Sequence, residues 1–339
     1  MRAQLAAFSW VGLGGAARAL SPGLIACAVV GAASAFLADH YGAPVMLFAL
    51  LLGMAMNFLA AEGACRPGIE FAARQVLRVG IALLGLRITA AQVVALGWEP
   101  AMLVLGAVAA TIAVSVLAAR ALGFDARFGL LTGGATAICG ASAALALAAA
   151  LPAHPAKERA TLFTVIGVSA LSTAAMVIYP AIVRALGLSD AQAGLFLGAT
   201  IHDVAQVVGA GYSISTPAGD AATLVKLMRV ATLLPVILLV ALGSRAGGAS
   251  GGQRPPLLPG FALAFAALVA ANSLGWVAPS VQAAGTGLSR WCLLAAIAAI
   301  GMKTQLRELA TVGWRPVLLM LGETAFLAGL AVAFLRATS

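Results

Sequence analysis

Eleven long apolar runs decide the class of this chain, because each is long enough to cross a lipid bilayer. They lie near residues 22–38, 43–61, 72–92, 100–120, 127–150, 160–183, 191–214, 222–243, 259–279, 284–302 and 316–335. Roughly 17–25 apolar residues in a helix span a hydrocarbon core of about 30 Å. Only 9% of the residues are charged, whereas a soluble domain has about 25%. The sequence therefore predicts an all-α polytopic membrane bundle, with one transmembrane domain over residues 1–339.

The net charge of +9 comes from twenty Lys and Arg residues scattered through short loops, without a basic run or basic domain. This distribution argues against nucleic acid as a partner and favours the positive-inside rule of proteins in a lipid bilayer. A cytoplasmic N-terminus places thirteen of the twenty on the cytoplasmic side. With eleven spans, the C-terminus is then periplasmic. The segment 244–260, rich in Gly, Ser and Pro, is expected to be a flexible cytoplasmic linker.

An internal repeat relates segments 85–106 and 301–322, which align without gaps at an offset of 216 residues. Each begins with Gly and a cation two positions on, Arg87 or Lys303, and each reaches Gly-Trp-x-Pro twelve residues after its start. The copies end the third and tenth spans, and an odd separation of seven spans gives them opposite orientations. Inverted repeats are typical of secondary transporters, whose binding site lies between the halves. The alternative is a coincidental match between two helix ends.

The segment 132-TGGATAICGASAALA-146 in the fifth span is rich in glycine and hydroxyl residues, which hold a continuous helix poorly. A broken helix survives in a bilayer only where its freed backbone groups are buried in protein or line a wet cavity. There the N-terminus of a half-helix and nearby hydroxyls can bind an anion. Close helix packing is the structural alternative. The candidate substrate-binding residues in this segment are Thr132, Gly133, Gly134, Thr136, Gly140 and Ser142.

A second such segment, 198-GATIHDVAQVVGAG-211, places His202 and Asp203 side by side in the seventh span. A charged, unpaired carboxylate at mid-membrane costs several kcal/mol, so intramembrane acids are functional candidates. Histidine has an ordinary pKa of about 6.5 and can change its charge in the physiological range. We expect His202 and Asp203 to form a pair that couples transport to protons, and Thr200 to contact the substrate. A purely structural hydrogen bond between the pair is the alternative.

Two cations, Lys226 and Arg229, lie three positions apart on one face of the eighth span. We expect both to face the site and to offset the charge of an anionic substrate. The alternative is that their long side chains extend to the membrane interface.

Three segments, GGATAICGASA, GATIHDVAQVVGAG and VKLMRV, resemble in order and spacing those of the YeiH-like sulfate exporter family of bacterial inner-membrane proteins. The resemblance covers the chain from the second span to the last, and implies sulfate or a sulfonate-like anion as substrate. It also implies a relation to the superfamily of cation:proton antiporters and bile acid:sodium symporters. In that superfamily two inverted repeats each contribute a discontinuous helix, and the two cross near the bilayer centre.

One feature conflicts with this arrangement. The fifth and seventh spans are only two spans apart, which gives them equal rather than opposite orientation. Either the span count errs between them, or the repeats are not arranged as a simple tandem pair.

The sequence thus favours a secondary-active transporter of a small anion, coupled to protons or another ion. The rival is an intramembrane serine protease, because 140-GASAA-144 has the Gly-x-Ser-x-small form and could pair Ser142 with His202. An anion channel is a further alternative. We expect no enzyme activity, cofactor or metal, since the sequence has no CxxC pair, HExxH or nucleotide-binding motif.

Overall fold

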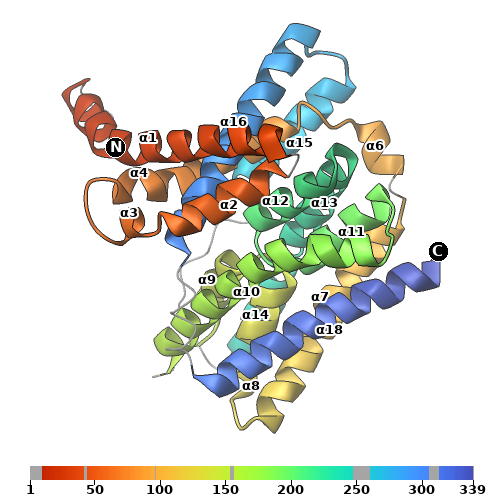
Figure 1. Cartoon of the computed structure of the whole chain (residues 1–339). Helices are drawn as coiled ribbons and strands as arrows, with labels where there is room; N and C mark the ends of the chain where they lie inside the picture. Colours follow the sequence, from red (N-terminus) through yellow and green to blue (C-terminus); the bar gives the residue numbers. More distant parts are fainter. Residues whose placement is uncertain are drawn as a thin grey trace, which may run out of the picture. The chain divides into compact units, whose positions relative to one another are not determined.

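The computed structural model describes residues 10–41, 44–95, 97–152, 156–246, 260–304 and 313–338. Throughout these residues the regular secondary structure is helical, which confirms the predicted all-α class (Figure 1). The chain divides into two compact units: unit 1 comprises Met1–Arg87 and Ala264–Gln305, and unit 2 comprises Ile88–Leu263 and Leu306–Ser339. Most of the predicted linker 244–260 lies outside the described residues.

Unit 1 is built from helices that approach one another closely through small residues. A Cβ atom on Gly53 of α2 would meet the Ala298 carbonyl oxygen of α16, and Gly301 of α16 faces the Leu50 carbonyl oxygen in the same way. Such small residues allow tight helix packing in a membrane. The helices are α1 (Trp10–Tyr41), α2 (Val45–Ala55), α3 (Phe58–Ala61), α4 (Arg66–Phe71), η1 (Ala72–Val76), α5 (Leu77–Leu84), α15 (Gly260–Ser273) and α16 (Pro279–Lys303).

Unit 2 contains the segments that the sequence marked as candidate sites. Its helices are α6 (Ala90–Ala95), α7 (Glu99–Ala121), α8 (Ala126–Ala137), α9 (Ala141–Ala150), α10 (Lys157–Ala185), α11 (Asp190–Thr200), α12 (Val204–Ile214), α13 (Thr216–Ala231), α14 (Leu233–Ala246) and α18 (Trp314–Thr338). Side-chain caps fix several of their starts: Asp125 caps α8, Asp203 caps α12, and Ser215 caps α13. Ser189 and Gln192 form a reciprocal capping box at the start of α11.

Six helical stretches among the described residues are long and apolar enough to cross a membrane: Ala17–Tyr41, Glu99–Ala121, Lys157–Ala185, Thr216–Val240, Pro279–Lys303 and Trp314–Thr338. Four shorter apolar helices accompany them: α2, α9, α12 and α15. The chain is therefore a polytopic helical membrane protein. Several of the predicted spans comprise more than one helix, and two of these, 127–150 and 191–214, are each a pair of half-length helices.

The first pair, which we call hairpin 1, consists of α8, the turn 138–140 and α9. Gly140 has a φ of +65° at this turn, a conformation that suits glycine. Leu147 of α9 packs against Gly134 of α8, and Leu131 and Ala148 belong to one buried cluster. Residues thirteen positions apart in one continuous helix would be about 20 Å apart. The two helices therefore fold back on each other.

The second pair, hairpin 2, consists of α11, the turn 201–203 and α12. Gly194 of α11 and Gly211 of α12 both pack against the Ala218–Ala222 stretch of α13, so they lie at the same level. Gly198 packs one turn further along α13, against Ala222 and Val225. The chain thus enters along α11, reverses at 201–203 and returns along α12. Both segments are interrupted, as the resemblance implied, but each folds back as a hairpin instead of continuing along one axis.

The hairpins lie along opposite halves of α10, which is 29 residues long. Hairpin 1 packs against the first half, where α9 and residues 157–165 line a shallow hollow. Hairpin 2 packs against the second half, where the Phe196 ring lies 5.3 Å from the Tyr179 ring between centroids. The Asp203 N–H donates to Ser172 Oγ over 3.0 Å, so the tip of hairpin 2 lies at the middle of α10. The predicted approach of segments 132–146 and 198–211 is confirmed by bonds between their tips, described below.

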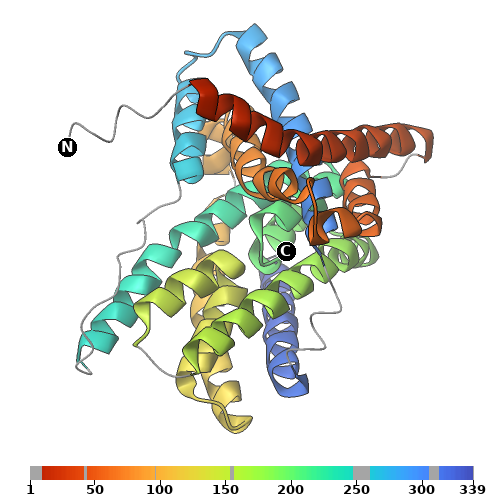
Figure 2. The same cartoon turned by 90° about the vertical axis from the view of Figure 1, so that its left-hand side faces the viewer.

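The internal repeat has a structural counterpart in α7 and α18. Each helix begins at a Gly-Trp pair whose glycine has a positive φ, +72° at Gly97 and +88° at Gly313; α7 starts just after Trp98, and α18 starts at Trp314 itself. The two helices pack against each other in unit 2 and run in opposite directions (Figures 1 and 2). Of the three boundaries between the units, those after Arg87 and after Gln305 fall inside the repeated segments, and the third falls after Leu263, within α15.

Candidate functional site

The tips of the two hairpins place backbone carbonyl groups of α8 and α11 close together. A helix leaves its last four carbonyls without an intrahelical partner, and its C-terminal end carries about half a negative charge. Both ends lie deep in unit 2, where all but one of the residues 129–140 and every residue of 193–202 are buried. Such a pair of helix ends needs hydrogen-bond donors and positive charge.

Lys226 of α13 supplies the first set of donors. Its side chain is fully buried, at 0% exposure. Its ammonium group donates to the carbonyl oxygen of Ile138 over 2.7 Å and to that of Ile201 over 3.0 Å, and also to the carbonyl oxygen of His202. An ammonium group has three donors. All three are therefore used, one on hairpin 1 and two on hairpin 2.

Arg229, one turn further along α13, makes a second set of bonds with a side chain that is 1% exposed. On hairpin 1 its guanidinium donates to Ala137 O over 2.8 Å and to Thr136 O over 2.8 Å. On hairpin 2 it donates to Gly198 O over 3.1 Å and to Ile201 O over 3.0 Å. The planar fork of arginine suits this simultaneous contact with two helix ends. Lys226 and Arg229 therefore face the site, and within the described residues neither forms an ion pair with a carboxylate.

His202, at the tip of hairpin 2, is fully buried and bonds through both ring nitrogens. Nδ1 lies 3.1 Å from Thr136 O of hairpin 1, and Nε2 lies 3.0 Å from Thr324 Oγ1 of α18. A carbonyl oxygen can only accept, so Nδ1 carries the hydrogen in this arrangement. His202 thus ties hairpin 2 to hairpin 1 and to α18. Its ring nitrogens bond to neither Asp203 nor Ser142.

Asp203 is half-buried and acts as the N-cap of α12. Its Oδ1 accepts from the Ala205 N–H over 3.0 Å. A carboxylate at this position satisfies one unpaired N–H of the helix and interacts well with its positive end. The structure therefore places His202 and Asp203 next to each other without the predicted hydrogen bond between their side chains.

Glu323 of α18 belongs to the site but was missed by the sequence reasoning. It is 3% exposed and accepts from three hydroxyl groups: those of Thr132 and Thr136 over 2.6 and 2.9 Å, and that of Ser115. A signal was available, because this glutamate lies in the middle of the apolar run 316–335. The rule that an intramembrane acid is a functional candidate would have identified it.

The remaining predicted residues divide into buried and exposed positions. The hydroxyls of Thr132 and Thr136 are turned toward Glu323, and that of Thr200 donates to Phe196 O within its own helix over 2.6 Å. Gly133 and Gly134 allow close packing against Ser115 and Leu147, respectively.

Only Ser142 among the predicted hydroxyl residues is exposed. It lies in the first turn of α9, whose N-cap Gly140 provides no side-chain hydrogen bond. The Ser142 hydroxyl and the N–H groups at the very start of this turn are donors of the kind that an anion prefers.

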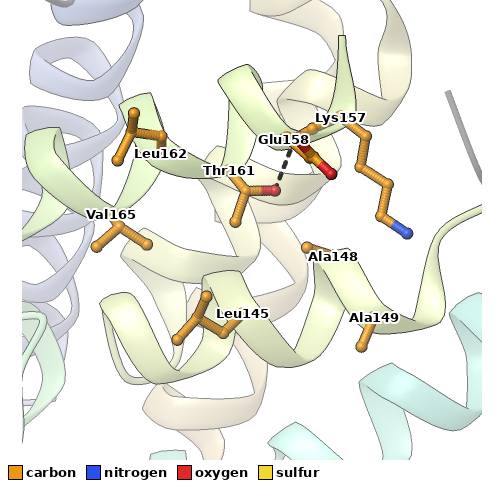
Figure 3. A pocket seen from close by; sticks show the side chains of 8 residues that line it. All are labelled: Leu145, Ala148, Ala149, Lys157, Glu158, Thr161, Leu162 and Val165. Atoms are coloured by element: carbon orange, nitrogen blue, oxygen red, sulfur yellow. Dashed lines mark hydrogen bonds between the residues drawn. The ribbon is translucent and has the colours of Figure 1, made fainter. Parts of the chain in front are cut away.

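A shallow hollow of about 430 Å³ lies between α9 and the start of α10 (Figure 3). Its wall is mostly apolar, and Lys157 and Glu158 are its charged residues. The Lys157 ammonium donates to Leu151 O over 2.8 Å at the end of α9. This lysine therefore caps a helix, and the hollow is separate from the hairpin tips.

Comparisons with known proteins identify relatives over nearly the whole chain. The family model described as conserved hypothetical protein 698 matches residues 22–320. The chain is 53% identical over 318 residues to the UPF0324 membrane protein TauZ of Paracoccus denitrificans, which covers 93% of this chain and 94% of that protein. It is 50% identical over 314 residues to the UPF0324 membrane protein CT0845 of Chlorobaculum tepidum, covering 92% and 88%. No solved structure matches.

Proposed function

The chain belongs to the family of conserved hypothetical protein 698, the UPF0324 membrane proteins, and we propose that it is a secondary-active transporter of a small anion. The family membership expected from the three sequence segments is thereby confirmed. The observation that carries the proposal is the pair of helical hairpins whose tips meet halfway along α10. Interrupted helices with exposed ends at mid-membrane are how secondary transporters build substrate sites.

The substrate site we propose lies at the N-terminus of α9, beside the hairpin tips. The exposed Ser142 hydroxyl and the first N–H groups of α9, which receive no side-chain cap from Gly140, would bind the anion. Lys226 and Arg229 would not contact the anion, because they bind carbonyl groups. They would attract it through the electrostatic potential of the tips. Two cations exceed the roughly one negative charge of two helix ends, so they leave an excess of about one positive charge at the tips. Sulfate or a sulfonate-like anion is the substrate class that we propose.

The coupling ion we propose is the proton, with His202 and Asp203 as candidate carriers. His202 belongs to hairpin 2 and bonds to hairpin 1 and to α18, so a change in its protonation would alter contacts of both hairpins. Asp203 caps α12 and is the half-buried acid of the tips. Its role in coupling is a prediction that replacement of Asp203 by asparagine tests.

Hairpins also change the proposed membrane topology. If 127–150 and 191–214 each return to the side they entered from, eleven spans become nine crossings, and the N-terminus stays cytoplasmic with the C-terminus periplasmic. Fourteen of the twenty Lys and Arg then lie inside and four outside, with Lys226 and Arg229 in the membrane. This asymmetry is stronger than that of eleven spans. The four outer residues are Arg87, Arg184, Arg290 and Arg336.

Cysteine labelling distinguishes the two topologies. In a background with the four native cysteines replaced by alanine, we expect Glu158→Cys to react with an impermeant maleimide only from the cytoplasmic side. Asp190→Cys, at the far end of α10, should react only from the periplasmic side; both positions are exposed. Eleven through-going spans predict the reverse for both positions. Arg120→Cys is cytoplasmic in either topology and controls for membrane sidedness.

The alternatives make different use of the same residues. A serine protease needs Ser142 within hydrogen-bond reach of a base, whereas both ring nitrogens of His202 bond to other groups. We therefore propose that the protein is not an enzyme. An anion channel would conduct sulfate but would not exchange it, so counterflow separates a channel from a transporter.

Sulfate counterflow in proteoliposomes tests the proposed function and its site. Wild-type protein loaded with unlabelled sulfate should take up labelled sulfate against its gradient. Ser142→Asp should reduce this exchange about ten-fold or more, because like charges 4 Å apart repel by about 4 kcal/mol near a protein surface. An acid in the first turn favours the α9 helix, so folding should persist. Asn57→Asp, an exposed position in unit 1, is the matched control. Equal exchange by Ser142→Asp and wild type would remove the site from the α9 N-terminus.

A further inference from the structure

We propose that Glu323 binds a transported proton and that its protonation makes the hairpin tips more positive as the anion binds. The proton site is inferred from the contacts of Glu323 in α18. Its coupling to an anion rests on the proposed function. The carboxylate bonds to hydroxyls of α7 and α8 and not to the N-terminus of α9, so this is a second site of different chemistry.

The first observation is that Glu323 is a buried acid with hydroxyl partners and no cation. Its carboxylate accepts from Thr132 Oγ1, Thr136 Oγ1 and Ser115 Oγ. Within the part of the chain that the structure describes, no Lys, Arg or His forms an ion pair with it. Burial of an unpaired charge in a membrane protein is costly, and such residues are retained where they carry protons or ions.

The second observation is that the hydroxyl partners can serve either protonation state. Ser115 Oγ also lies 2.6 Å from Gly129 O, and Thr132 Oγ1 lies 3.1 Å from Phe128 O. When Glu323 is ionised, the hydroxyls donate to it. When it is protonated, it donates to one hydroxyl, which turns its own hydrogen toward a backbone carbonyl. Both states are satisfied by rotating hydroxyl hydrogens, without movement of heavier atoms.

The third observation concerns the charges around this acid. The helices packed against α18 are α7, α8, α10 and α11. Those that contact the Glu323 carboxylate present the neutral hydroxyls just described. The ionisable groups linked to it are His202, through its bond to the neighbouring Thr324, and Arg229, through the carbonyl of Thr136. Glu323 is therefore connected to both hairpin tips through α8 and α18.

The expected coupling follows from counting charge at the tips. Lys226 and Arg229 contribute two positive charges, the ends of α8 and α11 about one negative charge, and the starts of α9 and α12 about one positive charge. Asp203 in its ionised form contributes one negative charge, and for this form the sum is about +1 when Glu323 is neutral and about zero when Glu323 is ionised. Proton binding at Glu323 therefore favours binding of the anion, and release of the proton favours release of the anion. Proton and anion therefore cross the membrane in the same direction.

The spacing of the oxygens favours a proton over a metal cation. Thr132 Oγ1 and Thr136 Oγ1 lie 2.6 and 2.9 Å from the carboxylate oxygens, which are hydrogen-bond distances. A cation the size of Ca²⁺ holds its oxygen ligands about 2.3–2.6 Å away, so neighbouring ligands are separated by about 3.3 Å or more. A cation of this size would have to push the three helices apart, whereas a proton fits the existing geometry.

The proton site is tested without substrate by pH-difference infrared spectroscopy on the protein in lipid. We expect wild type to show the C=O stretch of a buried protonated carboxyl that appears as the pH falls, and Glu323→Gln to lack it. Glu158→Gln, the matched control at an exposed glutamate of unit 2, should retain it. Thr136→Val removes one donor to the ionised form, so the midpoint of the same band should move to higher pH. If Glu323→Gln does not fold, the shift of the band midpoint in Thr136→Val still tests whether Glu323 is the protonated group. A band unchanged in Glu323→Gln, or unmoved in Thr136→Val, would overturn the inference, as would a spectrum that responds to sodium at constant pH.

The coupling of sulfate transport to the proton gradient is then measured in proteoliposomes. Sulfate uptake by wild type should be stimulated by a proton gradient, whereas Glu323→Gln should keep counterflow and lose at least about ten-fold of that stimulation. Stimulated uptake by Glu323→Gln equal to wild type would overturn the coupling. If wild type shows the carboxyl band but no sulfate counterflow, the proposed function fails and the proton site stands.

Discussion

Replacing Lys226 by methionine tests whether the two hairpins are held together through their carbonyl groups. Methionine is close to lysine in length and apolar, so Lys226→Met preserves much of the packing while it removes all three donors. The carbonyls of Ile138, Ile201 and His202 then lose their partner in a site with 0% exposure. The expected result is a local loosening of both tips rather than global unfolding.

The magnitude follows from two opposing contributions. A hydrogen bond to a charged group contributes about 1.5–3 kcal/mol, so three bonds contribute about 4.5–9 kcal/mol. Burying the ammonium group costs several kcal/mol, and the variant no longer has this cost. The net loss should be about 2–4 kcal/mol. At 1.36 kcal/mol per factor of ten, opening of the tips should increase about 30- to 900-fold.

Amide hydrogen exchange on the protein in detergent measures this opening directly. Peptides covering 136–142 and 198–205 should exchange faster in Lys226→Met by that factor, while α1 should be unchanged. Lys157→Met is the matched control, because Lys157 also donates to a helix-end carbonyl but is only partly buried. A partly exposed bond of this kind contributes at most about 1 kcal/mol, which is a change below about five-fold. Equal exchange in the two variants would refute the reasoning. We also expect Lys226→Met to lose transport, because the tips are no longer held in place.

Two further predictions concern the turns of the hairpins. Gly140→Ala should lower the stability of hairpin 1 by about 1–3 kcal/mol, because alanine does not readily adopt its φ of +65°; Gly106→Ala, an exposed helical position with nothing within 4 Å of a new Cβ, should be neutral or stabilising in the same thermal unfolding assay. Asp203→Asn should preserve the cap of α12, since asparagine caps as well as aspartate, and should uncouple transport from the proton gradient while anion binding persists. An unchanged pH profile of transport in Asp203→Asn would limit this residue to capping.

The sequence identified the correct segments, and its errors have physical reasons. Hydropathy reports the length of an apolar run, and 24 residues suffice for one crossing helix or for two half-length helices. The turns did leave traces. Gly140 follows the last residues of α8, and Asp203 precedes Val204-Ala-Gln206 in a pattern typical of a helix start. The sequence prediction interpreted these signals as interruptions of a helix that keeps its direction. In the structure the chain reverses its direction at each of them.

The partners of the cations could not be predicted from the sequence. Lys226 and Arg229 were placed correctly on one face of a helix, but they bind backbone carbonyls, which every residue has and which carry no side-chain signature. Glu323 illustrates the opposite case. Its acid group was visible in an apolar run, whereas its hydroxyl partners come from α7 and α8, about 190–210 positions earlier in the chain. Only the fold brings them together.

In the topology proposed above, the hairpins also resolve the conflict over repeat orientation. Two through-going spans separated by one crossing helix would have equal orientation, but two hairpins separated by one crossing helix enter from opposite sides. Hairpin 1 directly follows α7, whereas hairpin 2 packs against α18, which comes about 100 residues later in the chain. One repeat is therefore contiguous, α7 with hairpin 1, and the other joins α18 to a hairpin that precedes it. This order explains why the 216-residue offset relates the segments leading into α7 and α18 but not the two hairpins, which start 64 residues apart at Ala126 and Asp190.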